Sequence, residues 1–420
     1  MLSSFFSGIS GLMSNSYGIN VVGNNIANVN TIGYKGARAT FQDVLYQSVF
    51  GTAGTSQIGR GTALSSVDTI FAQGSFESTS EPTDLAIGGK GFFVVRQLNG
   101  DNPETDQTRL LYYTRAGQFR FDKQGYLVNP AGYLVQGWAL DGNGNIVGDY
   151  GDIQVSQEPS QPRATTYIAM ALNLQADAAV RTDTFDPADP SRTSDYSSSV
   201  TVYDVNGQSH VVSVYFRKVG EGQWDWHAMD AEGTTEVGTG TLNFTTTGLL
   251  DMGSGTPVDI TLPYLGGQTV RLGFNGADGG NATTQYPMAS ATNFQTQDGY
   301  PPGVLLNVTV SPEGVISGHY SNGQILDLYK LTLANFNNPW GLTREGGNLF
   351  SETLESGVAY TGGPGQNGLG KINPNSLEQS NVDLATEFVK MIVSQRGFQA
   401  NSRVITTTDE ILAELMNIKR

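Results

Sequence analysis

The chain has 420 residues, of which 53 are glycine and 15% are charged. This length allows several domains with substantial cores, and the glycine content favours many turns, so we expect a mainly β fold. Asp and Glu outnumber Lys and Arg by 39 to 23, giving a formal net charge of -16, which argues against a phosphate-neutralising surface and hence against nucleic acid as a partner. The absence of cysteine excludes disulfides, thiolate metal sites and a cysteine nucleophile.

The N-terminal segment is free of charge until Lys35. Its apolar positions recur in alternating steps of three and four residues, which is the spacing of a coiled-coil seam and predicts a helix of roughly 26 residues. Serines and asparagines interrupt this pattern too often for a membrane span or a secretory signal, so we expect no membrane insertion and no cleaved signal peptide. The apolar members of this seam are Leu2, Phe5, Ile9, Leu12, Ile19 and Ile26.

Uncharged polar residues line another face of the same predicted helix. Ser16, Asn20, Asn24 and Asn28 recur every four residues and therefore share one side. A helix face in water normally carries charge, whereas an amide tolerates contact with protein because its donors and acceptors can be paired there. A helix with every face suited to contact needs several neighbours, which indicates assembly.

A second seam begins at Leu384 and predicts a helix of roughly 36 residues that starts near Asn381. The two terminal helices, within residues 1–35 and 376–420, are expected to form a coiled-coil-like assembly domain. An ordinary antiparallel helix pair packed on a globular body explains the two patterns equally well. The apolar members of the second seam are Leu384, Phe388, Met391, Phe398, Ile405 and Leu412.

Both ends of the chain resemble the terminal signatures of the bacterial flagellar axial proteins, which are the rod, hook and hook-associated subunits. The resemblance rests on GINVVGNNIANVNTIGYKGARATF and on SNVDLATEFVKMIVSQRGFQANSRVITTTDEILAELMNI. The internal stretches LAIGGKGFFVV, YTRAGQFRFDKQGYLVNPAGYLVQGW and LANFNNPWGLTREGGNLFSETLESG are most similar to hook proteins. The family motif falls here on Asn24, Asn25, Asn28, Asn30, Thr31, Gly33, Tyr34 and Lys35.

The resemblance implies a structural subunit without catalytic activity. Copies would polymerise into the helical tube of the flagellar hook, the flexible joint that transmits torque from rod to filament. The implied partners are further copies, rod subunits, the hook cap, the hook-associated junction proteins and the flagellar export apparatus, with a location outside the cell after export. Phe5 and Ile9 match the spacing of the family's export signal, although both also lie on the seam. A distal rod subunit and an extracellular β-rich adhesin or binding module are the alternatives.

The segments between the helices have different characters. Residues 36–74 lack a long periodic pattern and are rich in Gly, Ser and Thr, which predicts an extended connector. Residues 75–165 contain hairpin signals, among them Gly125 in a tight turn and a second turn at NPAGY, and residues 300–375 resume the same style. We expect these two segments to form one β-rich middle domain.

Residues 166–299 are expected to form an inserted β-rich outer domain. Asn206 and Gly207 lie between two runs of alternating and β-branched residues, which is a strong hairpin signal. Trp224 and Trp226 follow on another predicted strand. The expected fold is therefore mainly β, with long terminal helices, an extended connector and two nested β-rich domains.

Motifs that would suggest an active site are weak in this sequence. GPGQNG (363–368) lacks the Ser or Thr of a phosphate loop, because Ile372 occupies that position, and no βαβ unit surrounds it. Residues 141–152 have the spacing of a calcium loop without its turn glycine or final Glu, so a loop between strands is expected and weak ion binding is left open. The histidines His210, His227 and His319 are scattered. We expect no catalytic, cofactor or metal site, although a spatial pair of carboxylates for glycoside hydrolysis is left open.

Charge predicts which helix faces a channel in an assembled tube. Residues 1–34 carry no charge, whereas residues 381–420 carry ten, five of each sign. Since charges resist burial and uncharged amides tolerate it, the C-terminal helix should line a water-filled channel. Arg396, Arg403 and Glu410 are the candidates for the lumen or for lateral pairs. The N-terminal helix should lie between the C-terminal helix and the outer domains.

Overall fold

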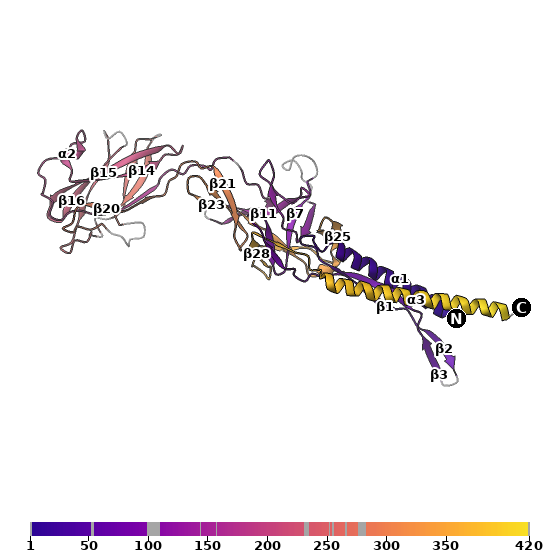
Figure 1. The fold of residues 1–420 in the computed structure, drawn as a ribbon. Helices are drawn as coiled ribbons and strands as arrows, with labels where there is room; N and C mark the ends of the chain where they lie inside the picture. Colours follow the sequence, from indigo (N-terminus) through magenta and orange to yellow (C-terminus); the bar gives the residue numbers. More distant parts are fainter. Residues whose placement is uncertain are drawn as a thin grey trace. The chain divides into compact units, whose positions relative to one another are not determined.

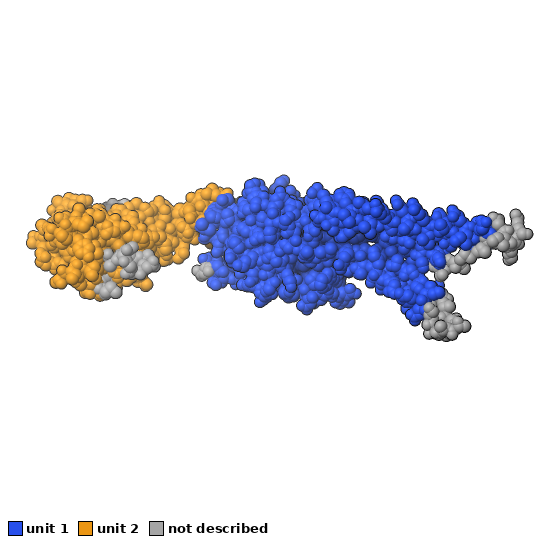
Figure 2. Space-filling model, turned by 60° about the horizontal axis from the view of Figure 1, so that its bottom comes forward, with its two compact units in different colours: residues 1–156, 307–319, 325–420 blue, residues 157–306, 320–324 orange. Residues whose placement is uncertain are grey.

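The computed structural model describes residues 2–51, 54–98, 110–142, 144–156, 158–230, 235–251, 253, 256–264, 267–275 and 283–418. The chain divides into two compact units (Figure 2). The first comprises residues 1–156, 307–319 and 325–420, and the second comprises residues 157–306 and 320–324. The fold is mainly β with one long helix at each end of the chain, as the sequence predicts.

The two terminal helices belong to the first unit and pack against each other as an antiparallel pair (Figure 1). They are α1 (Leu2–Ala27), of 26 residues, and α3 (Leu384–Ile418), of 35 residues. The predicted start of α3 at Asn381 was wrong, because Asp383 caps the helix by accepting a hydrogen bond of 2.7 Å from the backbone N–H of Thr386. Asn381 instead donates its amide hydrogens to the carbonyls of Ile70 and Ala72.

Residues 36–74, predicted to be an extended connector, form strands that pair with one another. Its outer strands β1 (Ala37–Asp43) and β4 (Thr62–Thr69) are antiparallel and both pack against α1. Between them β2 (Gln47–Gly51) and β3 (Gly54–Ile58) form a hairpin. The backbone is extended as predicted, and the pairing gives its amides and carbonyls the partners that an isolated connector would lack.

The body of the first unit is a 13-stranded sheet whose main path runs β21-β22-β23-β11-β7-β8-β26-β25. Strands from before and after the outer segment pair with each other in it: β11 pairs with β23, β7 with β24 and β8 with β26. Two short pairs, β28 with β6 and β29 with β5, stand beside it. The strands before the outer segment are β5 (Phe76–Ser78), β6 (Leu85–Gly88), β7 (Phe92–Arg96), β8 (Leu111–Thr114), β9 (Arg120–Phe121), β10 (Leu127–Val128), β11 (Leu134–Leu140) and β12 (Ile146–Asp152). The elements after it are β21 (Leu305–Val310), β22 (Val315–Tyr320), β23 (Ile325–Leu331), β24 (Leu333–Asn335), the short 3-10 helix η2 (Pro339–Gly341), β25 (Thr343–Gly346), β26 (Leu349–Ser351), β27 (Tyr360–Gly362), β28 (Lys371–Pro374) and β29 (Ser376–Glu378).

Strand β7 explains why this sheet has cores on both faces. Its sequence FFVVR is an apolar run of four residues followed by Arg96, and every residue in it is buried. Phe93 and Val95 belong to one hydrophobic cluster, whereas Phe92 and Val94 belong to a second. The predicted turn at Gly125 is confirmed by its φ of 83° and by the pairing of β9 with β10.

The second unit contains two four-stranded sheets, with the orders β18-β19-β13-β20 and β14-β15-β16-β17. Residues of both sheets share one core, which includes Trp224 and Trp226 on β16. The predicted hairpin at Asn206 and Gly207 is confirmed, because β14 pairs with β15 around it and Gly207 has a φ of 80°. The elements are β13 (Tyr167–Asn173), α2 (Pro190–Thr193), β14 (Tyr196–Tyr203), β15 (Ser209–Gly220), β16 (Gln223–Met229), β17 (Glu236–Asn243), β18 (Val258–Leu262), β19 (Gln268–Gly273) and β20 (Ala291–Gln297).

Candidate assembly site

In the contact between α1 and α3, glycines of each helix lie against side chains of the other. A Cβ built on Gly8 would lie 3.1 Å from Cγ1 of Ile405, and one built on Gly11 would lie 2.6 Å from Nδ2 of Asn401. From the other helix, a Cβ on Gly397 would lie 2.6 Å from Oδ1 of Asn15. These glycines therefore leave room for side chains of the facing helix, and a larger residue would displace those side chains. Glycine in a helix interior costs roughly 1 kcal/mol relative to alanine, so packing and not helix propensity holds α1 together.

The contact line on α1 runs one residue away from the predicted N-terminal seam. It passes through Gly8, Gly11, Asn15, Gly18, Val22 and Asn25, in the same alternating steps of three and four residues. The seam residues Phe5, Ile9, Leu12, Ile19 and Ile26 lie beside it and are only half-buried, and the side chain of Leu2 lies outside the described set. The glycine spacing was the signal that could have located the contact line.

On α3 the predicted seam residues divide into two groups. Met391, Ile405 and Leu412 are half-buried. Leu384, Phe388 and Phe398 remain 41%, 50% and 40% exposed. The helix pair of one chain thus leaves many apolar seam residues uncovered, and their role in assembly stays a prediction.

Asn25 of the motif connects three elements and is only 2% exposed. Its amide oxygen accepts a hydrogen bond of 2.9 Å from the backbone N–H of Ala37, at the start of β1. Its amide nitrogen donates to the carbonyl of Ala37 at 2.8 Å and to the carboxylate of Glu387 on α3 at 3.1 Å. A side chain that both donates and accepts is needed here, which explains an amide at a buried helix position.

The other motif residues shape the end of α1. Asn24 donates to the hydroxyl of Tyr34 at 3.0 Å, and Asn28 donates to the amide oxygen of Asn24 at 3.2 Å. Thr31 donates to Asn28 at 3.2 Å, while Asn30 is exposed.

Gly33 marks the closest approach between this end of α1 and the β body. It has a φ of 69°, and a Cβ there would lie 2.5 Å from the backbone nitrogen of Ala116. Only glycine satisfies both conditions. Its N–H also donates to the carbonyl of Glu378 at 2.7 Å.

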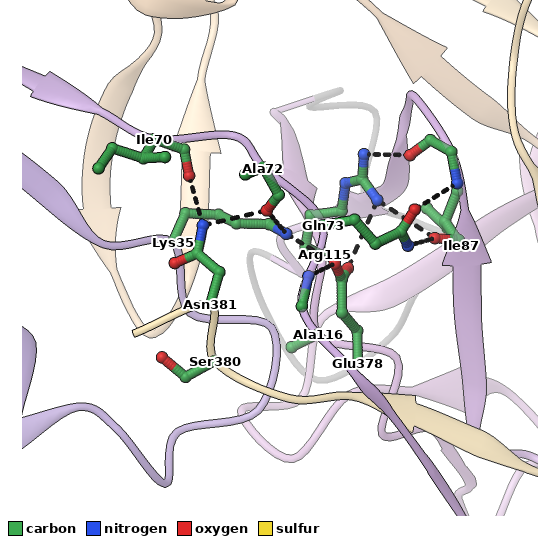
Figure 3. A network of polar contacts seen from close by, with 12 residues as sticks. Lys35, Ile70, Ala72, Gln73, Ile87, Arg115, Ala116, Glu378, Ser380 and Asn381 are labelled. Atoms are coloured by element: carbon green, nitrogen blue, oxygen red, sulfur yellow. Dashed lines mark hydrogen bonds and ion pairs between the residues drawn. The ribbon is translucent and has the colours of Figure 1, made fainter. Parts of the chain in front are cut away.

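Lys35 lies at the centre of a buried ionic network (Figure 3). Its Nζ is 2.7 Å from Oε1 of Glu378, and both side chains are fully buried. The same ammonium donates to the carbonyl of Ala72 at 2.9 Å. Arg115 approaches the other carboxylate oxygen at 3.4 Å, and the N–H of Gly74 donates to Oε1 at 2.9 Å.

Burial shifts the ionisation of both cations in this network. It lowers the pKa of Lys35, and the charge of Glu378 opposes that change. It also lowers the pKa of Arg115, again against the effect of Glu378. A buried charge is retained at a tolerable free energy only while its partners stay in place, so the network holds the ends of α1 and α3 to the β body.

Sequence reasoning missed four members of this site, namely Arg115, Glu378, Asn381 and Glu387. Each is a single polar residue without a local pattern, and only the fold brings it to the motif. The family motif itself located Asn25, Gly33 and Lys35, because their spacing was part of the resemblance. Arg115, Asn381 and Glu387 also stand in stretches that carry the resemblance, but nothing in those stretches indicates that they meet the motif.

The motifs considered as possible active sites lie in turns and strands of the β body. GPGQNG forms a turn between β27 and β28. The prediction of a loop over residues 141–152 was wrong for most of its length, because Ile146–Asp152 is strand β12 and pairs with β11. Residues 141–145 connect the two strands, Asn143 lies outside the described residues, and Asp152 pairs with Arg96 at 2.5 Å. Among the described residues, no group of three His, Cys, Asp or Glu side chains could hold a metal ion.

The three histidines also have structural neighbours. His210 stacks on Tyr264 with ring centroids 3.7 Å apart, and His227 stacks on Phe185 at 3.9 Å. His319 lies 3.1 Å from the hydroxyl of Thr309. Neither long helix, over its described length, offers an apolar stretch sufficient to cross a bilayer.

Full-length relatives identify the family. The chain is 38% identical to the flagellar hook protein FlgE of Borreliella burgdorferi, covering 100% of both chains. The chain belongs to the flagellar hook protein family. It is also 34% identical to the hook protein FlgE of Salmonella typhimurium, over 99% of this chain and 100% of that protein.

Family models of flagellar proteins match successive parts of this hook-family chain. They describe the flagella basal body rod protein (7–35), the flagellar hook protein FlgE/F/G D1 domain (86–170), the flagellar basal body protein FlaE D2 domain (173–300) and the flagellar basal body rod FlgEFG protein C-terminal region (373–418). The structure of the Helicobacter pylori flagellar hook protein FlgE2 superposes with a TM-score of 0.52 at 17% identity, covering 72% of this chain and all of that one. That likeness supports the fold.

Proposed function

We propose that the chain is the repeating subunit of the flagellar hook, the flexible tube that transmits torque from rod to filament, and that its role is mechanical and not catalytic. The observation that carries this proposal is the full-length identity to hook proteins, which includes both helices and the outer segment. A match to the terminal rod models alone would fit a rod subunit equally well. The relation over residues 173–300 favours the hook.

The helix pair suits a polymer better than a monomer. It buries one line of small residues and leaves apolar side chains such as Phe6, Met13 and Phe388 at least half exposed, at 58%, 54% and 50%. Copies related by a helical operator make heterologous contacts that do not close, which gives a tube of open length. The buried network at Lys35 would then pass load from the helices to the β body of the same copy.

We assign four parts to this subunit. Residues 1–35 and 376–420 form the assembly domain, and residues 36–74 form the connector. Residues 75–165 and 300–375 form the middle domain, and residues 166–299 form the outer domain.

The charged face of α3 is proposed to line the channel. Arg396, Arg403 and Glu410 are exposed and follow one another at intervals of seven residues, so they share one side of the helix. Asn401 and Ile405, which meet α1, lie on the opposite side. A channel wall that carries both positive and negative charges would bind neither acidic nor basic export substrates strongly. In this arrangement α1 lies between α3 and the outer parts of the tube.

The specific partners proposed are the rod subunits below, the hook cap during growth, the hook-associated junction proteins above, and the flagellar export apparatus. Phe5 and Ile9 are proposed as the export signal, since their spacing matches that of the family. Replacing both with Ala should leave the protein inside the cell. Undiminished secretion of the double variant would assign the two residues to the seam alone.

Electron microscopy of the purified chain at high concentration tests the proposed function. Curved tubes are expected for a hook subunit. Straight tubes would indicate a distal rod subunit. Persistent monomers would contradict self-assembly and favour a binding module.

A further inference from the structure

Apolar side chains lie on two opposite sides of α3, and α1 leaves both partly exposed: Val404 lies 3.6 Å from the position of a Cβ on Gly8 of α1 but is still 41% exposed. Residues in an α-helix are spaced by about 100° around the axis, so the line that meets α1 fixes the direction of every other residue. Phe388 and Phe398 lie to one side of this line. Val393, Val404 and Ile411 lie on the other side, about a quarter turn or slightly more away. These three residues, here called the aliphatic strip, are 64%, 41% and 52% exposed.

The first side continues onto α1. Because the helices are antiparallel, the positions of α1 that follow its contact line point to the same side as Phe388 and Phe398. Phe5, Ile9 and Leu12 occupy such positions and are half-buried. Together these five residues make one surface, here called the aromatic strip, which contains half of the seam residues predicted on α1.

The opposite side of α1 is already covered within the chain. The hydroxyl of Ser10 accepts a hydrogen bond of 3.2 Å from the N–H of Thr62 at the start of β4. The ring of Phe41 on β1 lies 3.9 Å from the position of a Cβ on Gly18. The strands β1 and β4 therefore shield one side of α1, and the aromatic strip faces away from them.

We infer that the aromatic strip of one copy binds the aliphatic strip of the next copy. This inference rests on the proposed function as a tube subunit. None of the eight strip residues is charged, and Asp409 is the charged residue of α3 that shares the side of Phe388 and Phe398. Pairing the strips therefore buries mainly apolar surface. Two different strips on opposite sides make a heterologous contact, which repeats from copy to copy. The side with Arg396 and Arg403, which also carries the exposed Val389 and Ile392, lies between the two strips.

The partner is a second copy because both halves of the contact exist on every chain. The strips flank the established contact between α1 and α3, so a neighbour seated on the aromatic strip extends the same helix layer. An unrelated partner would have to match one strip and leave the other uncovered in a protein whose relatives are hook subunits.

Disulfide trapping tests this contact cleanly, because the chain has no native cysteine. One set of molecules carries Phe398→Cys, and a second carries Val393→Cys, Val404→Cys or Ile411→Cys. The two sets are mixed, assembled and oxidised. The matched control replaces Arg403, one position from the aliphatic strip on the charged face, by Cys. We expect covalent dimers of Phe398→Cys with at least one aliphatic position and none with the control.

The outcomes separate this inference from the proposed function. Tubes without any cross-link between the strips would overturn the inference and leave the tube intact. Cross-links of Phe398→Cys only with itself would overturn it as well, since that contact is isologous. Absence of tubes from the unmodified chain would overturn the proposed function itself.

A charge substitution gives an independent measurement. Val404→Glu places a carboxylate in the aliphatic strip, whereas the control Thr407→Glu places the same group between Arg403 and Glu410. The concentration needed for assembly should rise at least about tenfold for Val404→Glu, because burying an unpaired charge is costly, and should change little for the control. Thermal unfolding of both monomers checks that the fold is retained. Equal effects of the two substitutions on assembly would contradict the inference.

Discussion

Lys35 is the residue on which the junction between the helices and the β body most depends. Its charge is fully buried and has Glu378 as its acidic partner, while Glu378 also accepts a hydrogen bond from the N–H of Gly74. Removing the cation leaves a carboxylate that cannot return to water. Arg115, at 3.4 Å, is a more distant partner for that carboxylate.

Lys35→Met should lower the free energy of unfolding by about 3–5 kcal/mol, the usual cost of leaving one member of a buried pair without its partner. Denaturant unfolding of the full chain measures the change. Glu378→Gln added to this variant should recover part of the loss, since a glutamine oxygen can still accept from Gly74 without carrying charge. A loss below about 1 kcal/mol would show that the network contributes little.

Asp383 gives the start of α3 a dependence on pH. Hydrogen bonds from Thr386 lower its pKa from the usual 3.8, so the folded chain favours the carboxylate more than the unfolded chain does. The carboxylate of Asp383 therefore contributes its full stabilisation to the folded chain above about pH 3.8. This contribution is lost as the pH falls through the lowered pKa. Asp383→Asn should remove this component of the acid transition. The helical circular dichroism of wild type and variant, followed from neutral to acid pH, should converge at the acid end.

At the scale of single elements, the glycines of α1 fall into two classes. Gly11 meets Asn401 of α3, whereas a Cβ on Gly23 would meet no atom of the described chain within 4 Å. Gly11→Val should therefore push the helices apart and cost about 1–3 kcal/mol, as overpacking does. Gly23→Val, the same change on the same helix, should have little effect on the monomer. Thermal unfolding of both variants compares them, and equal losses would contradict the close packing.

The elements that carry periodic or turn signals were predictable. Both helices, the hairpins at Gly125 and Gly207 and the strand with Trp224 and Trp226 follow from spacing and turn chemistry. The contact line of α1 was not predicted, because the seam was assigned from apolar residues, whereas the contact line contains Gly8, Gly11 and Gly18. The start of α3 was misplaced because Asn381 and Asp383 are both good caps, and tertiary contacts with Ile70 and Ala72 decide between them.

Only the residues of the candidate site that belong to the N-terminal motif could be predicted from the sequence. Asn25, Gly33 and Lys35 stand in one short motif, whereas Glu378 and Glu387 lie more than 340 residues further along the chain. Their pairing depends on the antiparallel docking of the two ends, which no local pattern encodes. For the same reason, sequence could not show that Arg115 would join them.

At the scale of the whole molecule, different surfaces are proposed for different tasks. We propose that the charge-free α1 and the two strips make the contacts between copies and that the mixed charges of α3 line the channel. Lys419 and Arg420, two of the ten charges counted near the C-terminus, lie outside the described residues, so this assignment rests on Arg396, Arg403 and Glu410. The buried network links α1 and α3 to the β body. We propose that this link lets one subunit both assemble and bear load.

A density map of tubes assembled from the purified chain tests this account most directly. We predict a hollow tube in which α3 forms the inner wall, with Arg396, Arg403 and Glu410 facing the channel and α1 packed outside it. A wall formed by Ser16, Asn20 and Asn24, with α3 at the larger radius, would contradict the account.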